Sequence, residues 1–186
     1  MKKIFALAIL ALIAIQLYFC LTDRDDRYTP YSVFKRKMDI AQLLQYRDPT
    51  FGYTILCPDF FEEEDTASSN SYQGYARFSY TDHANVILES YVTQAPNADL
   101  QDCADSLAQL LHAHKTMING KDSAFILSGA VYENGVRIDG YSHYGKYIKS
   151  GRSLFVYTLT YPNEYKEALT RLFAPIKQWK VLGAYH

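Results

Sequence analysis

The dipeptide Asn134-Gly135 constrains the fold of this chain more than any other short motif. It separates two stretches rich in β-branched and aromatic residues, 124–133 and 136–149, and Asn-Gly is the strongest short-range signal for a two-residue hairpin turn. A second turn pair at residues 150–151 leads into a third such stretch, 153–161. Strands joined by turns this short pair antiparallel, because a parallel connection needs a crossover of about a dozen residues.

The first half of the chain adds three more predicted strands. Residues 51–57 form the first, which stops at Pro58, and residues 72–80 and 85–93 form a pair joined by a short polar turn. The acidic run 62–65 predicts a solvated surface loop rather than a cation site, because consecutive side chains do not converge on one point. One face of the third strand carries the alternate residues Val86, Leu88, Ser90 and Val92.

Two amphipathic helices complete the predicted order. Residues 99–118 carry an apolar stripe at helical spacing and are followed by Asn119-Gly120, a left-handed stop signal. A second helix is predicted from Pro162-Asn163, with a break or kink at Pro175 and Trp179 packing beyond it. We therefore predict an α+β fold with a mainly antiparallel, six-stranded sheet in the order β-β-β-α-β-β-β-α. The helices pack on the sheet and both of its faces are covered.

An apolar segment at the N-terminus predicts export. Lys2 and Lys3 precede residues 4–21, a predominantly apolar run that is near the lower limit for a helix spanning a bilayer. A positively charged end before such a run is typical of a secretory signal. Residues 1–21 are thus predicted to be a signal peptide or an apolar membrane-anchor helix, with the rest of the chain in the cell envelope on the non-cytoplasmic side. A retained anchor, a cleaved signal and a lipid attached to Cys20 are the alternatives.

The remaining chain is predicted to contain a linker and one domain. Residues 22–45 form the linker, with a short helix whose apolar spacing runs from Val33 to Leu44, and residues 46–186 form a single α/β domain. Hydrophobic residues make up 48% of the sequence and charged residues 21%, which is typical of a globular chain. The net charge is −1 and no basic patch stands out, so nucleic acid is not expected as a partner.

Two motifs resemble a known family. Phe51-Gly-Tyr-Thr-Ile-Leu-Cys-Pro58 is similar to the opening strand of the PsbP-like α/β/α sandwich superfamily, and Leu159-Thr-Tyr-Pro162 resembles the segment before its final helix. The resemblance covers about residues 46–179. This superfamily takes its name from an extrinsic photosystem II protein and includes many bacterial envelope proteins. The resemblance implies the sandwich fold and a non-catalytic binding or assembly module, but it does not imply photosystem binding, because function does not follow from fold.

Few residues suggest chemistry. Cys57 and Cys103 lie outside the apolar segment, and in an exported chain they could form a disulfide or remain two buried thiols. His112 and His114 are two residues apart, so on the predicted helix they point about 200° away from each other and cannot share a metal. No nucleophile-elbow motif or glycine-rich phosphate loop occurs. We therefore assign no catalytic residue, metal site or cofactor.

The candidate binding surface is aromatic, in a sequence with 17 tyrosines. Tyr141, His143 and Tyr147 fall on one face of the predicted strand 136–149, where they could stack on a sugar or a partner protein. The alternative is that these rings lie beneath a helix as part of the core.

The leading functional hypothesis is a non-catalytic binding or assembly module whose partner is an envelope protein or another envelope component. A second hypothesis is a cysteine-dependent envelope hydrolase that uses Cys57 or Cys103 with His114 or His143. A third is a small-ligand-binding domain with an apolar pocket between the sheet and a helix.

Overall fold

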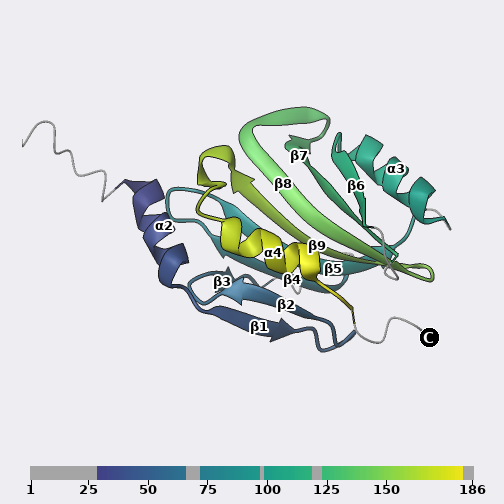
Figure 1. Ribbon diagram of the computed structural model, residues 1–186, viewed down its shortest axis with the longest axis horizontal. Coiled ribbons are helices and arrows are strands. Elements are labelled where there is room, and N and C mark those ends of the chain that lie inside the picture. Colours follow the sequence, from purple (N-terminus) through teal and green to yellow (C-terminus); the bar gives the residue numbers. More distant parts are fainter. Residues whose placement is uncertain (1–28, 66–71, 97–98, 119–122, 182–186) are drawn as a thin grey trace, which may run out of the picture.

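The computed structural model describes residues 29–65, 72–96, 99–118 and 123–181 (Figure 1). The predicted N-terminal helix with Cys20, and the predicted stop signal Asn119-Gly120, lie outside the described residues. The helices and strands in these ranges are α2 (Pro30–Ile40), β1 (Leu43–Arg47), β2 (Thr54–Pro58), β3 (Glu62–Glu63), β4 (Gln73–Tyr80), β5 (Val86–Gln94), α3 (Leu100–Leu110), β6 (His114–Ile118), β7 (Ala124–Glu133), β8 (Val136–Ser150), β9 (Ser153–Pro162), a 3-10 turn (Asn163–Tyr165) and α4 (Thr170–Gln178). None of the helices in the described ranges is long and apolar enough to cross a membrane.

Seven strands form one large sheet in the order β3-β4-β5-β9-β8-β7-β6, and β1 pairs with β2 in a separate two-stranded sheet. Every neighbouring pair is antiparallel, which confirms the predicted α+β class and the antiparallel pairing. The prediction of one six-stranded sheet is wrong. Part of the acidic run, predicted as a loop, is the short edge strand β3, which pairs with the end of β4.

The helix predicted over residues 99–118 ends at Leu110. His112 adopts a left-handed φ of 49°, which is incompatible with a continuing helix, and the chain returns as β6 against β7. The apolar spacing at His114 and Ile118 continues the helical stripe. The strand at these positions has only five residues, too few for alternation to show clearly.

The helix in the predicted linker also ends early. It stops at Ile40 rather than Leu44, after which the chain forms β1 against β2. Thr29 begins the helix, because its side chain accepts a hydrogen bond from the backbone N–H of Ser32. The α2 residues Phe34 and Met38 are fully buried in the larger hydrophobic cluster, so this helix packs with the rest of the domain.

The helix at the C-terminus begins as a 3-10 turn, and α4 then continues past Pro175 to Gln178. Of the predicted break or kink at this proline, the break is therefore wrong. Leu172 and Ile176, on either side of it, are fully buried, and their packing on the sheet outweighs the one hydrogen bond that proline removes. Trp179 packs beyond the helix as predicted: its indole Nε1 donates to the carbonyl of Thr54 at 2.7 Å.

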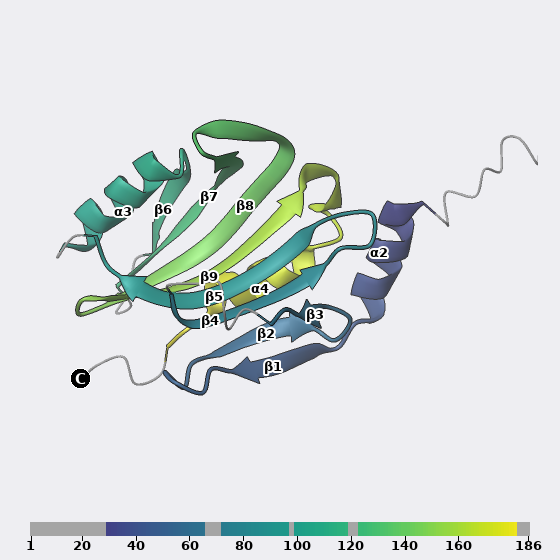
Figure 2. The ribbon, with the colours of Figure 1, turned by 180° about the vertical axis from the view of Figure 1, so that it is seen from behind.

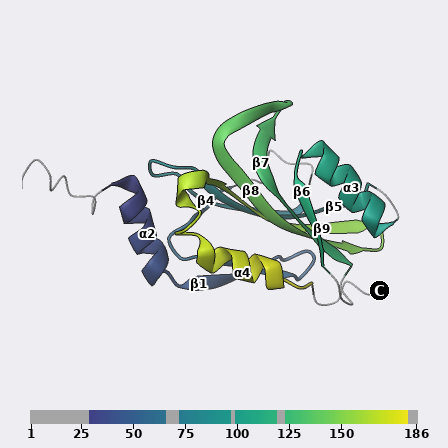
Figure 3. The same cartoon turned by 45° about the horizontal axis from the view of Figure 1, so that its top comes forward.

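Two hydrophobic clusters lie on the two faces of the large sheet. Alternate residues of β9 show the division: Phe155 and Tyr157 belong to the larger cluster, Leu154 and Val156 to the smaller one. The larger cluster is covered by α2, α4 and the β1–β2 sheet, and the smaller one by α3, so helices lie on both faces of the sheet (Figure 3). However, α3 lies over β6 and β7, and no described helix lies in front of β4 and β5 on this face (Figure 2).

The Asn134-Gly135 turn joins β7 and β8 as predicted, with φ values of 51° and 79° that a type I′ turn requires. The pairing of these two strands is interrupted by a bulge in β8. Ala130 pairs with Ser142, whereas the next residue of β7 pairs with Ile138. Gly140 lies inside this bulge with a φ of 79°. Because a bulge bends its strand, the tip of the hairpin curls over the sheet face beside α3 (Figures 1 and 3).

Candidate functional site

The curled hairpin, the end of α3 and the face of the large sheet enclose a pocket of about 190 Å³. We call it the His143 pocket. None of its lining residues is Lys, Arg, Asp or Glu. They come from β5, α3, β7, β8 and β9: Tyr91, Leu110, Leu111, Ala130, Val131, Tyr132, His143, Tyr147, Thr158 and Thr160.

The imidazole of His143 has one partnered and one unpartnered nitrogen. Its Nδ1 lies 3.2 Å from the carbonyl oxygen of Ala130. A carbonyl only accepts hydrogen bonds, so Nδ1 carries the proton and Nε2 is the acceptor of a neutral ring. Burial lowers the pKa of His143, which keeps the ring neutral at pH 7. Nε2 is itself buried and has no hydrogen-bond partner within the described part of the chain.

The floor of the pocket depends on a glycine. A Cβ atom at Gly145 would lie 2.4 Å from Cγ2 of Thr158 and 3.3 Å from Cε2 of Tyr147. A separation of 2.4 Å does not occur between carbon atoms that pack normally, so only glycine leaves room for the Thr158 methyl group against β8. Gly145 therefore sets the position of the Thr158 side chain on the sheet.

The rim of the pocket is apolar and exposed. Leu110, the last residue of α3, is 72% exposed, and Tyr132 of β7 is 37% exposed. The centroid of the His112 ring lies 4.5 Å from that of the Tyr132 ring. His112, whose left-handed φ prevents α3 from continuing, therefore also packs against this tyrosine. Exposed apolar side chains gathered at a concave surface are typical of binding sites.

A stack of three tyrosines extends the site onto β4 and β5. The Tyr72 and Tyr91 rings stack with centroids 4.5 Å apart, and the Tyr75 ring lies 6.1 Å from Tyr91. The Tyr75 hydroxyl donates to Glu89, and burial, together with this carboxylate, raises its pKa to about 12. We call Tyr72, Tyr75 and Tyr91 the tyrosine stack. Tyr91 also lines the His143 pocket, so the two features form one continuous surface.

The charged residues beside the tyrosine stack pair with one another. Arg77 lies 3.0 Å from Glu64 and 3.5 Å from Glu89. Glu64, which belongs to the acidic run of the sequence, is thereby held at the sheet by a cation of the protein itself. One guanidinium group faces two carboxylates here, so one negative charge is left beside the neutral rings of the stack.

The structure brings together two of the three residues expected on the binding surface. His143 and Tyr147 line the pocket, but Tyr147 is only 4% exposed and stacks on Phe125 at 5.2 Å. Tyr141 instead lines a separate hollow of about 400 Å³ with His83. Sequence reasoning missed Tyr91 and Tyr132. The signal for Tyr91 was its position opposite the apolar residues of its strand, which placed it on the other face.

Cys57 and Cys103 are buried free cysteines in the structure, which is the second of the two alternatives that the sequence left open. Cys57 belongs to the larger cluster and Cys103 to the smaller one, on opposite sides of the sheet, whereas a disulfide needs Cα atoms within about 7 Å. Burial raises the pKa of Cys57 to about 11, and Cys103 is fully buried. Across the described ranges, no group of three or more His, Cys, Asp or Glu side chains gathers in a way that could hold a metal ion.

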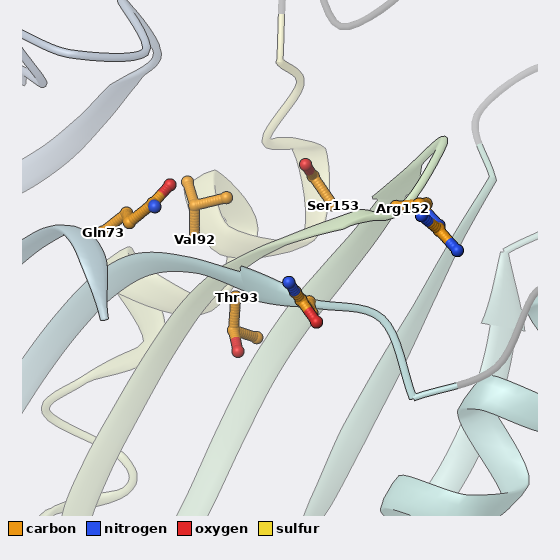
Figure 4. A pocket seen from close by; sticks show the side chains of 6 residues that line it. Gln73, Val92, Thr93, Arg152 and Ser153 are labelled. Carbon is orange, nitrogen blue, oxygen red and sulfur yellow. The ribbon is translucent and has the colours of Figure 1, made fainter. Parts of the chain in front are cut away.

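A larger hollow of about 450 Å³ lies at the ends of β4, β5 and β9, with Gln73 at one side and Arg152 at the other (Figure 4). The other labelled side chains, Val92, Thr93 and Ser153, are spread along the strands rather than directed at one point. Because these polar groups are open to water and are not arranged around a centre, the His143 pocket is the better candidate site.

The comparisons with known proteins concern the fold. No protein-family model and no curated protein matches the chain. The structure is similar to cyanobacterial PsbP (CyanoP) from Synechocystis sp. PCC 6803, with 14% identity, a TM-score of 0.49 and coverage of 75% of this chain and 92% of that chain. It is also similar to LpqN, involved in cell envelope biogenesis of Mycobacterium tuberculosis, with 16% identity, a TM-score of 0.43 and coverage of 80% and 94%. Neither similarity assigns a ligand or partner to this chain.

Proposed function

We propose that this chain is a non-catalytic binding module of the cell envelope, exported or anchored by its apolar N-terminal segment, and that it binds an envelope component through the His143 pocket and the tyrosine stack. The observation that carries the proposal is the concave sheet face beside α3. That face has an exposed apolar rim and an aromatic stack, and no described helix covers its β4–β5 side. A folded protein rarely leaves such a surface in water unless a ligand or partner uses it.

The burial of both thiols supports a non-catalytic role. A catalytic cysteine needs an exposed thiol whose pKa is lowered, usually by a nearby cation or a helix N-terminus. Cys57 has the opposite shift, because burial raises its pKa, and Cys103 is 0% exposed. Nε2 of His143 has no hydrogen-bond partner among the described residues, so no described thiol or hydroxyl group is placed there as a nucleophile for it to activate. The geometry thus favours binding over the cysteine-hydrolase alternative.

The pocket also supports the small-ligand hypothesis in one form. It lies between the sheet and the end of a helix, as that hypothesis required, and its volume is about 190 Å³. An apolar cavity of about 150 Å³ holds one benzene-sized molecule. We therefore expect the pocket to accept a single ring, either as a whole ligand or as one group of a larger envelope component that also contacts the tyrosine stack.

Site-specific photocrosslinking in the native cell tests this proposal. A photoreactive phenylalanine analogue at Tyr132 or Tyr72 should give defined adducts, because both rings are partly exposed at the site. Leu44 on β1 is the matched control, since it is 49% exposed but belongs to the small sheet that covers the opposite face. Mass spectrometry of the adducts identifies the component. Equal adducts from Leu44, or adducts from Leu44 alone, would overturn the proposed binding surface.

A protease accessibility experiment tests the compartment separately. Protease added outside the cytoplasmic membrane of osmotically opened cells should cleave the full chain in the part after the apolar segment. Protection of that part until the membrane is dissolved would place it in the cytoplasm and contradict the envelope location.

A further inference from the structure

We propose that the His143 pocket binds a phenolic ring whose hydroxyl group donates a hydrogen bond to Nε2 of His143. This inference rests on the proposed function, since it takes the pocket as the binding site and names the class of group that enters it.

The pocket contains an unpartnered hydrogen-bond acceptor, Nε2 of His143. The proton on Nδ1 points to the carbonyl of Ala130, so Nε2 presents a lone pair that needs a donor. A buried acceptor without a donor is costly, and among the described residues no side chain or backbone group satisfies this one. A ligand that brings a hydroxyl or N–H group removes that cost, whereas a carboxylate or a phosphate would add a second acceptor.

The lining of the pocket determines which charge the ligand can carry. None of the residues that line the pocket is charged at pH 7, because His143 is neutral and the others are apolar, hydroxyl-bearing or aromatic. A charged ligand would lose water here and gain no counter-charge. The pocket therefore favours a neutral ligand.

The volume and walls of the pocket limit the shape and polarity of the ligand. The volume of about 190 Å³ suits one ring, and Tyr91, Tyr132 and Leu111 supply flat or apolar walls. A sugar ring needs a partner for each of its several hydroxyl groups, whereas the walls of this pocket are mostly apolar or aromatic; beyond His143, the side-chain polar groups that line it are the hydroxyls of three tyrosines and two threonines. A ring with a single hydroxyl group fits this combination of walls and acceptor.

The ligand ring must also be able to reach Nε2 of His143. Nε2 is shielded from water in the unliganded chain, so a ring reaches it only when side chains that line the pocket, such as those of Leu110 and Tyr132, move aside. Both side chains are exposed and lie at the ends of elements, where they can move without disturbing either core. The same shielding keeps bulk water from competing for Nε2 once the ring is bound.

Fluorine NMR on the full chain in lipid nanodiscs tests the inference. The probes are 4-fluorophenol and 4-fluorotoluene, which have nearly the same shape but differ in the hydroxyl group, with empty nanodiscs as the reference for partition into lipid. We expect 4-fluorophenol to bind the wild type at least tenfold more tightly than 4-fluorotoluene. His143→Phe should remove that preference by weakening 4-fluorophenol binding at least tenfold. His114→Phe, which changes an exposed histidine on β6 outside the pocket, should leave it unchanged.

The outcomes separate the inference from the proposed function. Equal binding of the two probes to the wild type would show a ring pocket without hydroxyl recognition; it overturns the inference and leaves the proposed function standing. Binding of neither probe, or tighter binding of methyl β-glucoside, also overturns it, while crosslinking decides the proposed function independently. If His143→Phe does not fold, the comparison of the two probes on the wild type still decides. If N-acetyltyrosinamide binds more tightly than 4-fluorophenol, the ring comes from a tyrosine side chain. If 4-fluorophenol binds more tightly, the ring comes from a free phenol.

Discussion

The substitution Gly145→Ala tests how tightly the floor of the pocket is packed. The added Cβ would lie 2.4 Å from Cγ2 of Thr158, on the neighbouring strand β9, so the methyl group must move into space held by other side chains. Overpacking of this kind costs about 1–3 kcal/mol. Replacing glycine by alanine in a strand returns about 0.5–1 kcal/mol of backbone entropy. Because a separation of 2.4 Å is a severe overlap, the upper half of the overpacking range applies, and the expected net loss in the free energy of unfolding is about 1–2 kcal/mol.

Urea unfolding followed by tryptophan fluorescence measures this loss. Trp179 is the single tryptophan of the chain, is buried, and packs against the rings of Tyr53 and Tyr157, so its emission reports the larger core. In a domain of this size, a loss of 1–2 kcal/mol corresponds to a fall in Tm of about 2–8 °C.

The double mutant decides whether the reasoning is right. Thr158→Ser removes Cγ2 but keeps the hydroxyl group, so in that background Gly145→Ala should cost less than about 0.5 kcal/mol. The contacts of the added Cβ with Cβ of residue 158 at 3.2 Å and with Cε2 of Tyr147 at 3.3 Å remain and prevent a full gain. If Gly145→Ala costs the same in both backgrounds, the Thr158 methyl group is not the obstacle and our account of the pocket floor is refuted.

Three further predictions concern the packing around the sheet. Lys146→Met should lower the free energy of unfolding by about 1–3 kcal/mol in urea titrations, because the buried ammonium group donates to two carbonyls at the end of α4. A variant more stable than the wild type would mean that the desolvation of the ammonium group costs more than these hydrogen bonds contribute. Arg171→Ala should speed amide hydrogen exchange in α2 and not in α3, since its guanidinium group donates to carbonyls at the end of α2; equal changes in both helices would contradict this. Burial raises the pKa of Cys57 from 9.0 to about 11, so the unfolded thiol ionises first and stability should fall between pH 9 and pH 11. Cys57→Ala should make that fall shallower, and in the native chain neither Cys57 nor Cys103 should react with a thiol reagent at pH 7.

The parts of the fold that the sequence predicted are those where local and tertiary preferences agree. Asn134-Gly135 specifies its own turn, and the alternation from Val86 to Val92 needs only one buried face, so both could be read without knowing the partner strands. The errors arose where tertiary pairing overrides a short local pattern. β1 and β6 have five residues each, and their apolar spacing also extends a preceding helix. Pairing with β2 and β7 decides between the two states, and that pairing is not visible locally.

The candidate site was predicted only in part for the same reason. Strand periodicity placed His143 and Tyr147 on one face, but it could not show that Tyr147 is covered while His143 borders an opening. That difference depends on where α3 ends and on how far the β7–β8 hairpin bends. Tyr132 joins the site only because of the bend, which arises from a shift in register; Gly140, which lies inside the bulge with a left-handed φ, is the signal in the sequence that could have located it.

The bulge in β8 makes the direction of the hairpin tip independent of the pairing of the central strands. From Tyr141 onward β8 pairs with β9, and up to Ile138 it pairs only with the tip of β7, so residues 139 and 140 belong to neither ladder. A residue gained or lost at this point would change the lean of the hairpin without shifting the register of the central strands. The width of the opening above His143 can therefore change during evolution, to suit rings of different size, while the packed interior stays as it is.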